Sequence, residues 1–439
     1  MDPEKVSDLT ALYIIDESTG RYLTSDSADT GVVFYSENPS PYKSWWLNMG
    51  KDQTQGTCVL RNMHSFFCAR ISVLSDGHIY EGKGITIKDV DPDYSVPEPS
   101  RIKTDRVIGV QMCNLWNSQN CPGGWDKIIP YSDREPVIGY YDEGDPVVTD
   151  WEIKMATDNG VNFFMPCWYR AKGNKGKPVA SLLDHWIKSL KKARYSRYIK
   201  YMVMWENANG IADGVLDEDD LLTNVTPYLI DNFFKDDCYL KPGNKPVLSI
   251  YIPELIINEL GGTQSASSAF TKMKEKVIEA GFDGLTLIGQ YCWGPTGKTH
   301  EQLKECGFDY TMSYHWPTFL HGILDNKKAV FSDGEIIKGQ QLCWEDQAKA
   351  MLPNIVNCSM GWDSAPWNGS STTKAWRLTP ASFRELLMKA KAFTSGKDEY
   401  ASRIIMIDNW NEFGEGHYIM PAKEYGFGYL DAVREVFLI

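Results

Sequence analysis

The sequence contains no apolar run of about 18 residues, so none of its segments is predicted to cross a membrane as a helix. Its first residues, from Met1 to Lys5, also lack the basic and apolar regions of a signal peptide. These two absences leave the compartment open. We expect a periplasmic, cell-surface or secreted protein if an export signal was removed, and a cytoplasmic protein otherwise.

Positive charge is also in short supply. The chain has 45 Lys and Arg residues against 58 Asp and Glu residues, which gives a formal net charge of −13 and an isoelectric point near 5.1. The sequence shows no basic cluster that could neutralise the phosphates of a nucleic acid. Nucleic acid is therefore not an expected partner.

The ten cysteines show neither a CxxC pair nor a spacing typical of a zinc site. No metal and no other cofactor is therefore predicted. Cys113, Cys167 and Cys358 lie inside apolar runs, where a thiol behaves as a small buried hydrophobe. Cys58 and Cys68, which lie in strand-like stretches, are the best candidates for a disulfide bond.

What the sequence does contain is a run of acids, amides and aromatics at residues 408–418. Glu412 and Glu415 lie three positions apart and follow an apolar run, residues 404–407, that predicts a buried strand. If the segment turns helically, both carboxyl groups share one face, with Cβ atoms about 5–6 Å apart. Such a pair suits work on opposite sides of one bond at a sugar carbon. A solvated turn with incidental acids is the alternative, because this spacing is common on helices.

Short β-rich runs alternate with helical patterns from residue 106 onward. Strands are predicted at residues 106–112, 161–165, 200–204, 247–251, 285–289, 310–314, 355–359 and 404–407. Helices are predicted around residues 145–159, 180–193, 218–234, 270–281, 340–352, 379–390 and 425–436, with Asp145 and Thr379 at helix starts. Eight such strands predict an α/β fold, a (β/α)8 TIM barrel over residues 101–439. A doubly wound sheet is the alternative, but no Gly-rich phosphate loop follows the first strand.

The ends of these predicted strands carry similar residue types. Enzymes built on this barrel place their chemistry at the C-terminal ends of the strands. Each residue taken alone is equally well explained by packing, but the recurrence predicts a polar cleft with aromatic walls. The residues are Asn114, Trp116, Trp125, Trp168, Tyr169, Arg170, Trp205, Glu206, Asn207, Gln290, Tyr291, Trp293, Tyr314, His315, Trp316, Trp362, Asp363, Glu412 and Glu415.

The last of these motifs points to a known group. Residues 411–416, Asn-Glu-Phe-Gly-Glu-Gly, resemble the Asn-Glu-aromatic-x-Glu-Gly signature of the glycoside hydrolase family 99-like and WbsX-like proteins. Weaker matches follow in order over residues 106–439: Gly139-Tyr140-Tyr141 with Asp145-Pro146, Trp205-Glu206-Asn207, Gly361-Trp362-Asp363 and Thr379-Pro380.

The resemblance implies a (β/α)8 barrel that acts on α-linked glycans, typically endo-acting on mannosides with retention of configuration and without a metal. It implies that Glu415 is the general acid/base and that Glu412 draws the proton from the sugar 2-hydroxyl, so that a transient 1,2-anhydro sugar forms. Close like charges push the two pKa values apart, which suits one protonated and one ionised carboxyl group. The substrate-binding residues predicted on this basis are Trp116, Tyr141, Trp168, Tyr169, Trp205, Glu206, Asn207, Tyr314, His315, Trp362, Asp363, Asn411 and Tyr418.

Two departures from the family 99 pattern bear on the substrate. Phe413-Gly414 stands between the glutamates where family 99 carries Trp-His, so the chain is nearer the WbsX-like branch, whose members are often described as polysaccharide-biosynthesis glycosyltransferases. The order Trp205-Glu206-Asn207 also differs from the more usual Ala-Asn-Glu-Asn, which leaves the role of Glu206 open.

Three functions are consistent with these motifs, each with an oligo- or polysaccharide as the expected partner. The motifs favour a retaining glycoside hydrolase. A WbsX-like glycosyltransferase needs a donor site, and the DxD spacing occurs only near residues 89–93, in a predicted linker, and at Asp217-Glu218-Asp219, where acids open a helix. A non-catalytic glycan-binding protein would use the same cleft. The sugar, its linkage and the oligomeric state are not predicted.

Residues 1–100 differ from the rest, with short alternating stretches and no helical period, so a small β-rich domain is predicted there. Residues 12–15 with 18–23 resemble one repeat of a ricin-type β-trefoil lectin, a fold that needs three repeats. The Pro-rich residues 91–100 are predicted to form a linker.

Overall fold

The computed structural model of the protein describes residues 96–116, 124–208, 210–290, 298–316, 330–369, 375–396, 400 and 403–439, together with the backbone of seven strands within the first 95 residues. Those seven strands form one antiparallel sheet in the order β3-β2-β1-β4-β5-β6, with β7 also pairing with β1. They are β1 (Ala11–Asp16), β2 (Tyr22–Ser25), β3 (Val33–Ser36), β4 (Ser44–Asn48), β5 (Thr57–Asn62), β6 (Cys68–Ser72) and β7 (Ile85–Asp89).

The sheet agrees with the β-rich texture predicted for this part of the chain. A separate domain over residues 1–100 stays a prediction, and the Cys58–Cys68 bond concerns side chains outside the described residues.

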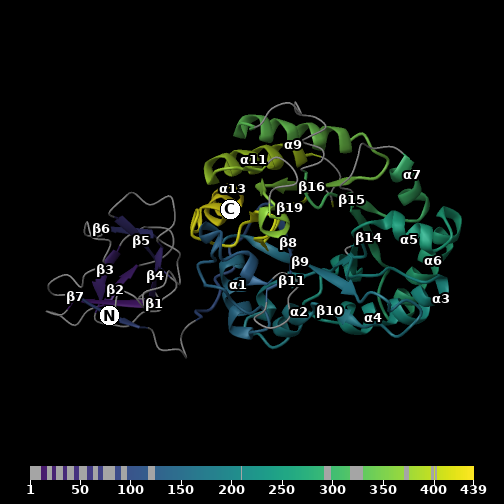
Figure 1. Ribbon diagram of the computed structural model, residues 1–439, viewed down its shortest axis with the longest axis horizontal. Coiled ribbons are helices and arrows are strands. Elements are labelled where there is room, and N and C mark those ends of the chain that lie inside the picture. The colour runs from purple at the N-terminus through teal and green to yellow at the C-terminus, as the bar shows by residue number, and fades with distance from the viewer. Residues whose placement is uncertain are drawn as a thin grey trace.

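Eight parallel strands close into a barrel, which confirms the predicted fold class (Figure 1). Each strand pairs with the next, and the last pairs with the first through Ile404 opposite Val107 and Ile407 opposite Val110. The strands are β8 (Val107–Met112), β9 (Val161–Arg170), β12 (Met204–Glu206), β13 (Val247–Ile250), β14 (Thr286–Gln290), β15 (Tyr310–Met312), β16 (Asn354–Ser359) and β19 (Ile404–Asp408).

Helices surround these strands (Figure 1). They include α1 (Pro146–Thr157), α2 (His185–Leu190), α5 (Pro253–Glu259), α6 (Thr263–Glu279), α7 (Lys298–Glu305), α9 (Asp333–Gln347), α11 (Pro380–Thr394) and α13 (Gly428–Phe437). A further helix runs from Glu218 to Phe234 and contains α3 (Glu218–Asp220), α4 (Thr226–Leu229) and two π-helical turns. None of the described helices is long and apolar enough to span a membrane.

Several boundaries differ from the sequence-based prediction. The third predicted strand divides into β11 (Lys200–Tyr201) and β12. The helix predicted at residues 180–193 shortens to α2, because β10 (Ser181–Leu182) pairs antiparallel with the end of β9. Helices α5 and α7 were not predicted. The predicted helix starts at Asp145 and Thr379 are confirmed, since each side chain accepts a hydrogen bond from the first turn of its helix.

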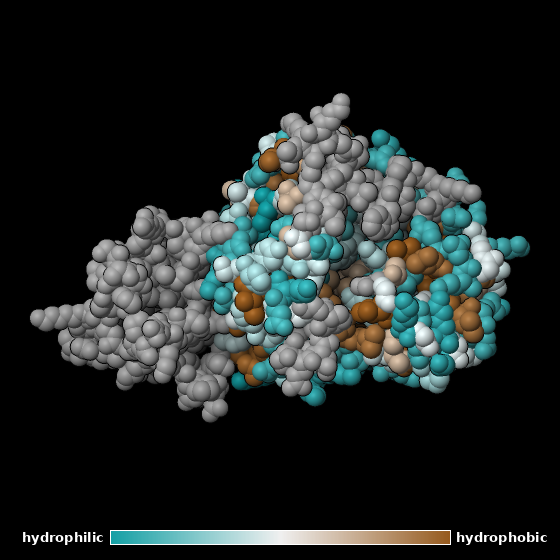
Figure 2. All heavy atoms as spheres, in the orientation of Figure 1, coloured by the Kyte–Doolittle hydropathy of each residue, from teal (hydrophilic) through white to brown (hydrophobic). Residues whose placement is uncertain are grey.

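The surface of the barrel is mostly hydrophilic on the face shown in Figure 2, with a few separate apolar clusters. The interior is apolar and closely packed. Gly109 of β8 lies opposite Phe163 of β9, and a Cβ atom at this glycine would lie 2.2 Å from the Phe163 ring and 2.4 Å from the sulfur of Met406. Two large buried side chains therefore occupy the space that a methyl group would need.

The substitution Gly109→Ala tests this packing. We expect it to lower the free energy of unfolding by about 1–3 kcal/mol, because the barrel interior must shift to admit the methyl group. Denaturant titration of both proteins measures the change.

Gly334→Ala is the matched control. No atom lies within 4 Å of a Cβ at Gly334, which is in the first turn of α9. Alanine there is expected to be neutral or to stabilise by about 0.4–1 kcal/mol. If Gly109→Ala changes the free energy of unfolding no more than Gly334→Ala does, the barrel interior can admit a methyl group and the packing argument is wrong.

Candidate active site

The two glutamates lie on a β-hairpin that follows the last barrel strand. Glu412 ends β20 (Asn411–Glu412), which pairs antiparallel with β21 (His417–Tyr418), so that Asn411 faces Tyr418 and Glu412 faces His417. The helical turn considered from the spacing is therefore wrong. The backbone of residues 411–412 takes its partners from residues 417–418, and Glu415 sits in the connection between them.

Polar groups from elsewhere in the chain hold this hairpin in place. The guanidinium of Arg134 donates to the carbonyl of Phe413 at 2.7 Å and also contacts the carboxylate of Asp363. The backbone N–H of Asp363 in turn donates to the carbonyl of Glu415 at 2.6 Å. These contacts hold the backbone from which the two acidic side chains project.

A second arginine completes the support. Arg377, in β18 (Trp376–Arg377), donates to the carbonyl of Gly416 at 2.7 Å and lies over the ring of Tyr418 at 4.0 Å. It also pairs with Glu424 at 2.9 Å. Both arginines therefore bind backbone carbonyls and other acids, and neither has an ion pair with Glu412 or Glu415 among the contacts of the described residues.

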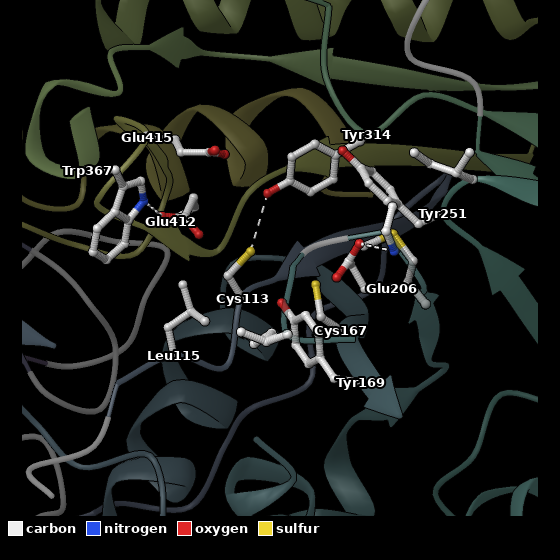
Figure 3. A pocket seen from close by; sticks show the side chains of 14 residues that line it. Cys113, Leu115, Cys167, Tyr169, Glu206, Tyr251, Tyr314, Trp367, Glu412 and Glu415 are labelled. Atoms are coloured by element: carbon white, nitrogen blue, oxygen red, sulfur yellow. Dashed lines mark hydrogen bonds between the residues drawn. The ribbon is translucent and has the colours of Figure 1, made fainter. Parts of the chain in front are cut away.

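The side chains of Glu412 and Glu415 open into a cavity of about 520 Å³. Figure 3 shows Trp367 with both glutamates at one side of it and Glu206 with Tyr251 at the other. The described residues that line the cavity are Cys113, Leu115, Cys167, Tyr169, Met204, Glu206, Ala208, Ile211, Tyr251, Ile252, Tyr314, Trp367, Glu412 and Glu415.

Burial sets the acidity of this pair. It raises the pKa of Glu412 to about 7, and the negative charge of Glu415 adds to the effect against smaller opposing contributions from His417, Cys113 and Trp367. Burial also raises the pKa of Glu415 to about 7, opposed by a hydrogen bond from Tyr314. Near neutral pH the pair can therefore hold one proton between two carboxyl groups, an arrangement that acid/base catalysis requires.

Trp367, from α10 (Ala365–Asn368), packs directly on the hairpin. Its indole N–H donates to Oε1 of Glu412 at 3.2 Å, and the backbone N–H of Gly414 donates to the same oxygen at 3.1 Å. A Cβ atom at Gly414 would lie 1.9 Å from the indole ring. Glycine at this position therefore lets the tryptophan reach the carboxylate.

A scan of family models matches residues 131–433, more than two thirds of the chain, to the family described as glycosyltransferase WbsX. The chain belongs to the WbsX family. A curated relative is the uncharacterized protein WxcX of Xanthomonas campestris pv. campestris, 22% identical over 326 residues, which cover 68% of this chain and 42% of the relative. The chain thus spans less than half the length of the curated relatives that it matches.

Solved structures share the barrel of this WbsX-family protein. The family 99 endo-alpha-mannosidase from Bacteroides thetaiotaomicron, in complex with bis-tris-propane, aligns with a TM-score of 0.51 and 19% identity over 76% of this chain and 96% of that one. A glycoside hydrolase-like protein aligns with a TM-score of 0.55 and 15% identity over 78% and 97%. At these identities the likeness establishes the fold.

Five of the residues predicted from the sequence meet at the cavity of the WbsX-family chain: Tyr169, Glu206, Tyr314, Glu412 and Glu415. They come from β9, β12, the segment after β15, and the final hairpin. Parallel strands that close into a ring bring their C-terminal ends together, which is why residues so far apart in sequence converge.

Five others support the hairpin, and two of these, Asn411 and Tyr418, are part of it. Trp116 is fully buried, stacks on Trp125 with ring centroids 4.2 Å apart, and donates to the carbonyl of Asn411 at 2.8 Å. The side-chain oxygen of Asn411 accepts a hydrogen bond from the backbone N–H of Cys113 at 3.1 Å. Of the remaining three, Tyr141 and Tyr418 are buried and Asp363 is partly buried. None of these five lines the cavity.

Three predicted residues, Trp168, Trp205 and Asn207, lie behind the cavity wall on the β9–β12 side and do not line the cavity. The rings of Trp168 and Trp205 are buried and lie 5.4 Å apart. Asn207 exchanges two hydrogen bonds of 2.9 Å with the backbone of Ile252, a residue that does line the cavity. Direct contact of these three with substrate stays a prediction, and their described role is to fix the wall.

The last two, His315 and Trp362, stack on each other with centroids 4.3 Å apart and stay out of the cavity. Tyr291 and Trp293, also expected at a strand end, lie outside the described residues. Among the described residues, no group of three or more His, Cys, Asp or Glu side chains is placed to hold a metal ion.

Several lining residues were missed from the sequence. Tyr251 directly follows β13, so the strand-end rule applied to the fourth strand would have found it. Cys113 and Cys167 were predicted to be buried, which is confirmed, yet both also line the cavity. Met112 faces Pro166 in the paired strands, so the two thiols leave neighbouring strands at the same level. Trp367 lies in α10, a short helix within a loop, and no pattern in the sequence predicted that it would line the cavity.

The raised pKa values predict how stability depends on pH. Glu412 and Glu415 move from 4.5 to about 7 on folding, so the folded protein holds more protons than the unfolded chain between these values. Stability must therefore fall as pH rises through this window. We expect Glu412→Gln to raise the free energy of unfolding by about 1–3 kcal/mol at pH 8 and to change it much less at pH 5.

Denaturant titrations at the two pH values measure this difference. Glu435→Gln is the control, because Glu435 lies on the surface of α13 in an exposed pair with Arg384. It is expected to behave alike at both pH values. A loss of stability for Glu412→Gln at pH 8 would contradict the assignment.

Proposed function

We propose that this WbsX-family protein is a retaining glycoside hydrolase that acts on α-linked glycans, mannan-like or related polysaccharides. One observation carries the proposal: Glu412 and Glu415 open into the same cavity, and burial raises the pKa of both to about 7. The shared barrel with a family 99 endo-alpha-mannosidase supports this choice of reaction class.

In the first step, ionised Glu412 takes the proton of the sugar 2-hydroxyl. The 2-oxygen then attacks the anomeric carbon while the bond from that carbon to the leaving oxygen breaks. Protonated Glu415 gives its proton to the leaving oxygen, so the products are a free chain end and a 1,2-anhydro sugar. One carboxyl group must be ionised and the other protonated at the start, which the mutual repulsion of the pair favours.

In the second step, Glu415 takes a proton from water as the water oxygen attacks the anomeric carbon. The bond between that carbon and the 2-oxygen breaks, and Glu412 returns its proton to the 2-oxygen. Two displacements at one carbon restore the original configuration, so the proposed route retains it. Both carboxyl groups end in the protonation states in which they began.

The charge of the cavity favours a hydrolase over a transferase that uses a nucleotide sugar. Among the described residues that line it, three are glutamates and none is Lys, Arg or His. Among these described residues, a diphosphate would meet the negative charge of the glutamates and no Lys or Arg side chain that could stabilise its release. The rings of Tyr169, Tyr251 and Trp367 offer faces on which a neutral sugar can stack.

The family description keeps glycosyltransferase as the second candidate, since the matching family model carries that name. A glycan-binding protein without catalysis is the third, because the same cavity would serve it. These alternatives give different outcomes in the two experiments that follow.

Glu415→Gln is expected to lose at least about 100-fold in glycan cleavage, because the leaving oxygen then receives no proton. Products from α-mannans and related polysaccharides, separated and identified by mass, measure the activity. Circular dichroism checks that the variant folds. Glu435→Gln, remote on the surface of α13, should keep wild-type turnover. Full activity in Glu415→Gln would refute the assigned role.

Thermal stabilisation by ligands separates hydrolase from transferase. Oligosaccharide products are expected to raise the melting temperature of the wild-type protein, whereas nucleotide sugars are expected to leave it unchanged, because the cavity carries no cation among its described lining residues. A concentration-dependent shift with a nucleotide sugar would favour the transferase. Binding without turnover over a broad glycan panel would favour the binding protein.

A further inference from the structure

His417 lies directly behind Glu415 and takes no part in the route above. It is on β21, is fully buried, and does not line the cavity. Its Nε2 is 3.0 Å from Oε2 of Glu415, and its Nδ1 is 3.8 Å from Oδ2 of Asp408 at the end of β19. The imidazole therefore lies between a carboxyl group that faces the cavity and one inside the barrel.

Aromatic packing fixes the orientation of this ring. His315 lies nearly parallel to it with centroids 5.4 Å apart, and Trp362 and Tyr314 each lie 5.5 Å away. The Tyr314 ring meets it edge to face at 89°. A ring enclosed in this way cannot exchange the positions of its nitrogens without moving its neighbours, so Nε2 stays directed at Glu415.

The charged and titratable groups around the ring come from several elements. Glu412 and Glu415 belong to the hairpin and Asp408 to β19, and Cys358 of β16 lies near Asp408. Arg377 of β18 and Arg134 add positive charge, and Tyr314 and His315 follow β15. Burial lowers the pKa of His417 to about 4, with the two arginines adding to the effect and Glu412 opposing it. The imidazole is therefore neutral at neutral pH.

Asp408, the carboxyl group on the other side of the ring, is buried as well. Burial raises its pKa well above the usual range, although hydrogen bonds from Ser359 and Asn357 oppose this. The hydroxyl of Ser359 donates to Oδ2 at 2.7 Å. Because burial favours the protonated form of Asp408, this carboxyl group attracts the imidazole proton less than an exposed carboxylate would.

A neutral imidazole carries one N–H, and the contacts decide which nitrogen has it. Nδ1 has no hydrogen-bond partner among the described residues, and 3.8 Å to Asp408 exceeds hydrogen-bond range. A proton on Nδ1 would bury an unpaired donor and, once Glu415 has given up its proton, leave a bare Nε2 against a carboxylate. A proton on Nε2 avoids both penalties.

We propose that His417 is a positioning residue that donates from Nε2 to Oε2 of Glu415 and so leaves the transferable proton to the other oxygen, Oε1. This inference rests on the proposed function of Glu415 as the acid/base. The donor also stabilises the carboxylate that remains after Glu415 has given up its proton, so it helps Glu415 to act as an acid.

The substitution His417→Phe keeps a ring against His315 and Trp362 and removes the donor. We expect kcat to fall about 10-fold or more and KM to change little, since the contact is with the acid and not with the substrate. The pKa of Glu415 is expected to rise by about one unit, which moves the alkaline limb of the pH profile of kcat/KM to higher pH by the same amount. His417→Gln, which keeps an N–H donor, should recover part of both effects.

The ionisation of Glu415 is also measured without activity, by ¹³C NMR titration of labelled glutamate carboxyl groups, with Glu415→Gln to assign the signal. Glu435→Gln is the control in this titration, because Glu435 lies on the surface of α13 in an exposed pair with Arg384. It is expected to leave the pKa of Glu415 unchanged. If His417→Phe also leaves it unchanged, the positioning role is refuted, even where the protein cleaves glycans.

The converse result separates the two hypotheses. Suppose that the wild-type protein cleaves no glycan and that His417→Phe still raises the pKa of Glu415. This result would uphold the hydrogen bond and refute the proposed function. Should His417→Phe not fold, the ¹⁵N shifts of the wild-type imidazole decide the matter. A protonated Nε2 with a bare Nδ1 supports the inference, and the reverse pattern overturns it.

Discussion

The candidate site depends on the burial of Glu412 and the partial burial of Glu415, neither of which pairs with a lysine or arginine among the described residues. Moving a carboxylate out of water is costly unless a positive charge or several donors accompany it. Arg134 and Arg377 lie close by, yet they bind the carbonyls of the hairpin and the acids Asp363 and Glu424. Had either guanidinium paired with Glu412 or Glu415, it would have lowered that pKa and favoured loss of the proton that the proposed reaction uses.

The same arrangement explains why so many aromatic residues near the site do not face the cavity. Trp116 and Trp125 stack beneath the hairpin, and His315 and Trp362 stack beside it. These rings exclude water from the backs of the two acids while leaving their front faces open. Their contribution to the chemistry is therefore indirect, because low polarity behind the carboxyl groups raises the two pKa values.

Much of the fold could be predicted from the sequence, because barrel strands buried on both faces read as short β-branched runs separated by helical periods. The residues at strand ends were found for the same reason, and the hairpin acids stood out through their motif. Packing within the site could not be predicted. Nothing local in the sequence distinguishes Tyr169, which lines the cavity, from its neighbour Trp168, which is buried against Tyr228.

Nor could spacing decide between helix and hairpin at residues 411–418. The glutamates lie three positions apart in either case, and only the pairing of β20 with β21 settles the geometry. Trp367 illustrates a further limit. Its approach to Glu412 depends on the missing side chain of Gly414, a relation between two distant loops that no single stretch of sequence expresses.

The pairing of β19 with β8 joins the two ends of the barrel, and it has a consequence for synthesis on the ribosome. Until β19 emerges, both β8 and β16 present bare strand edges, which are prone to pair with other chains. The acids that follow β19 emerge later still. The nascent chain therefore carries two unpaired strand edges before the candidate site exists, and β19 covers both of them when it joins the barrel.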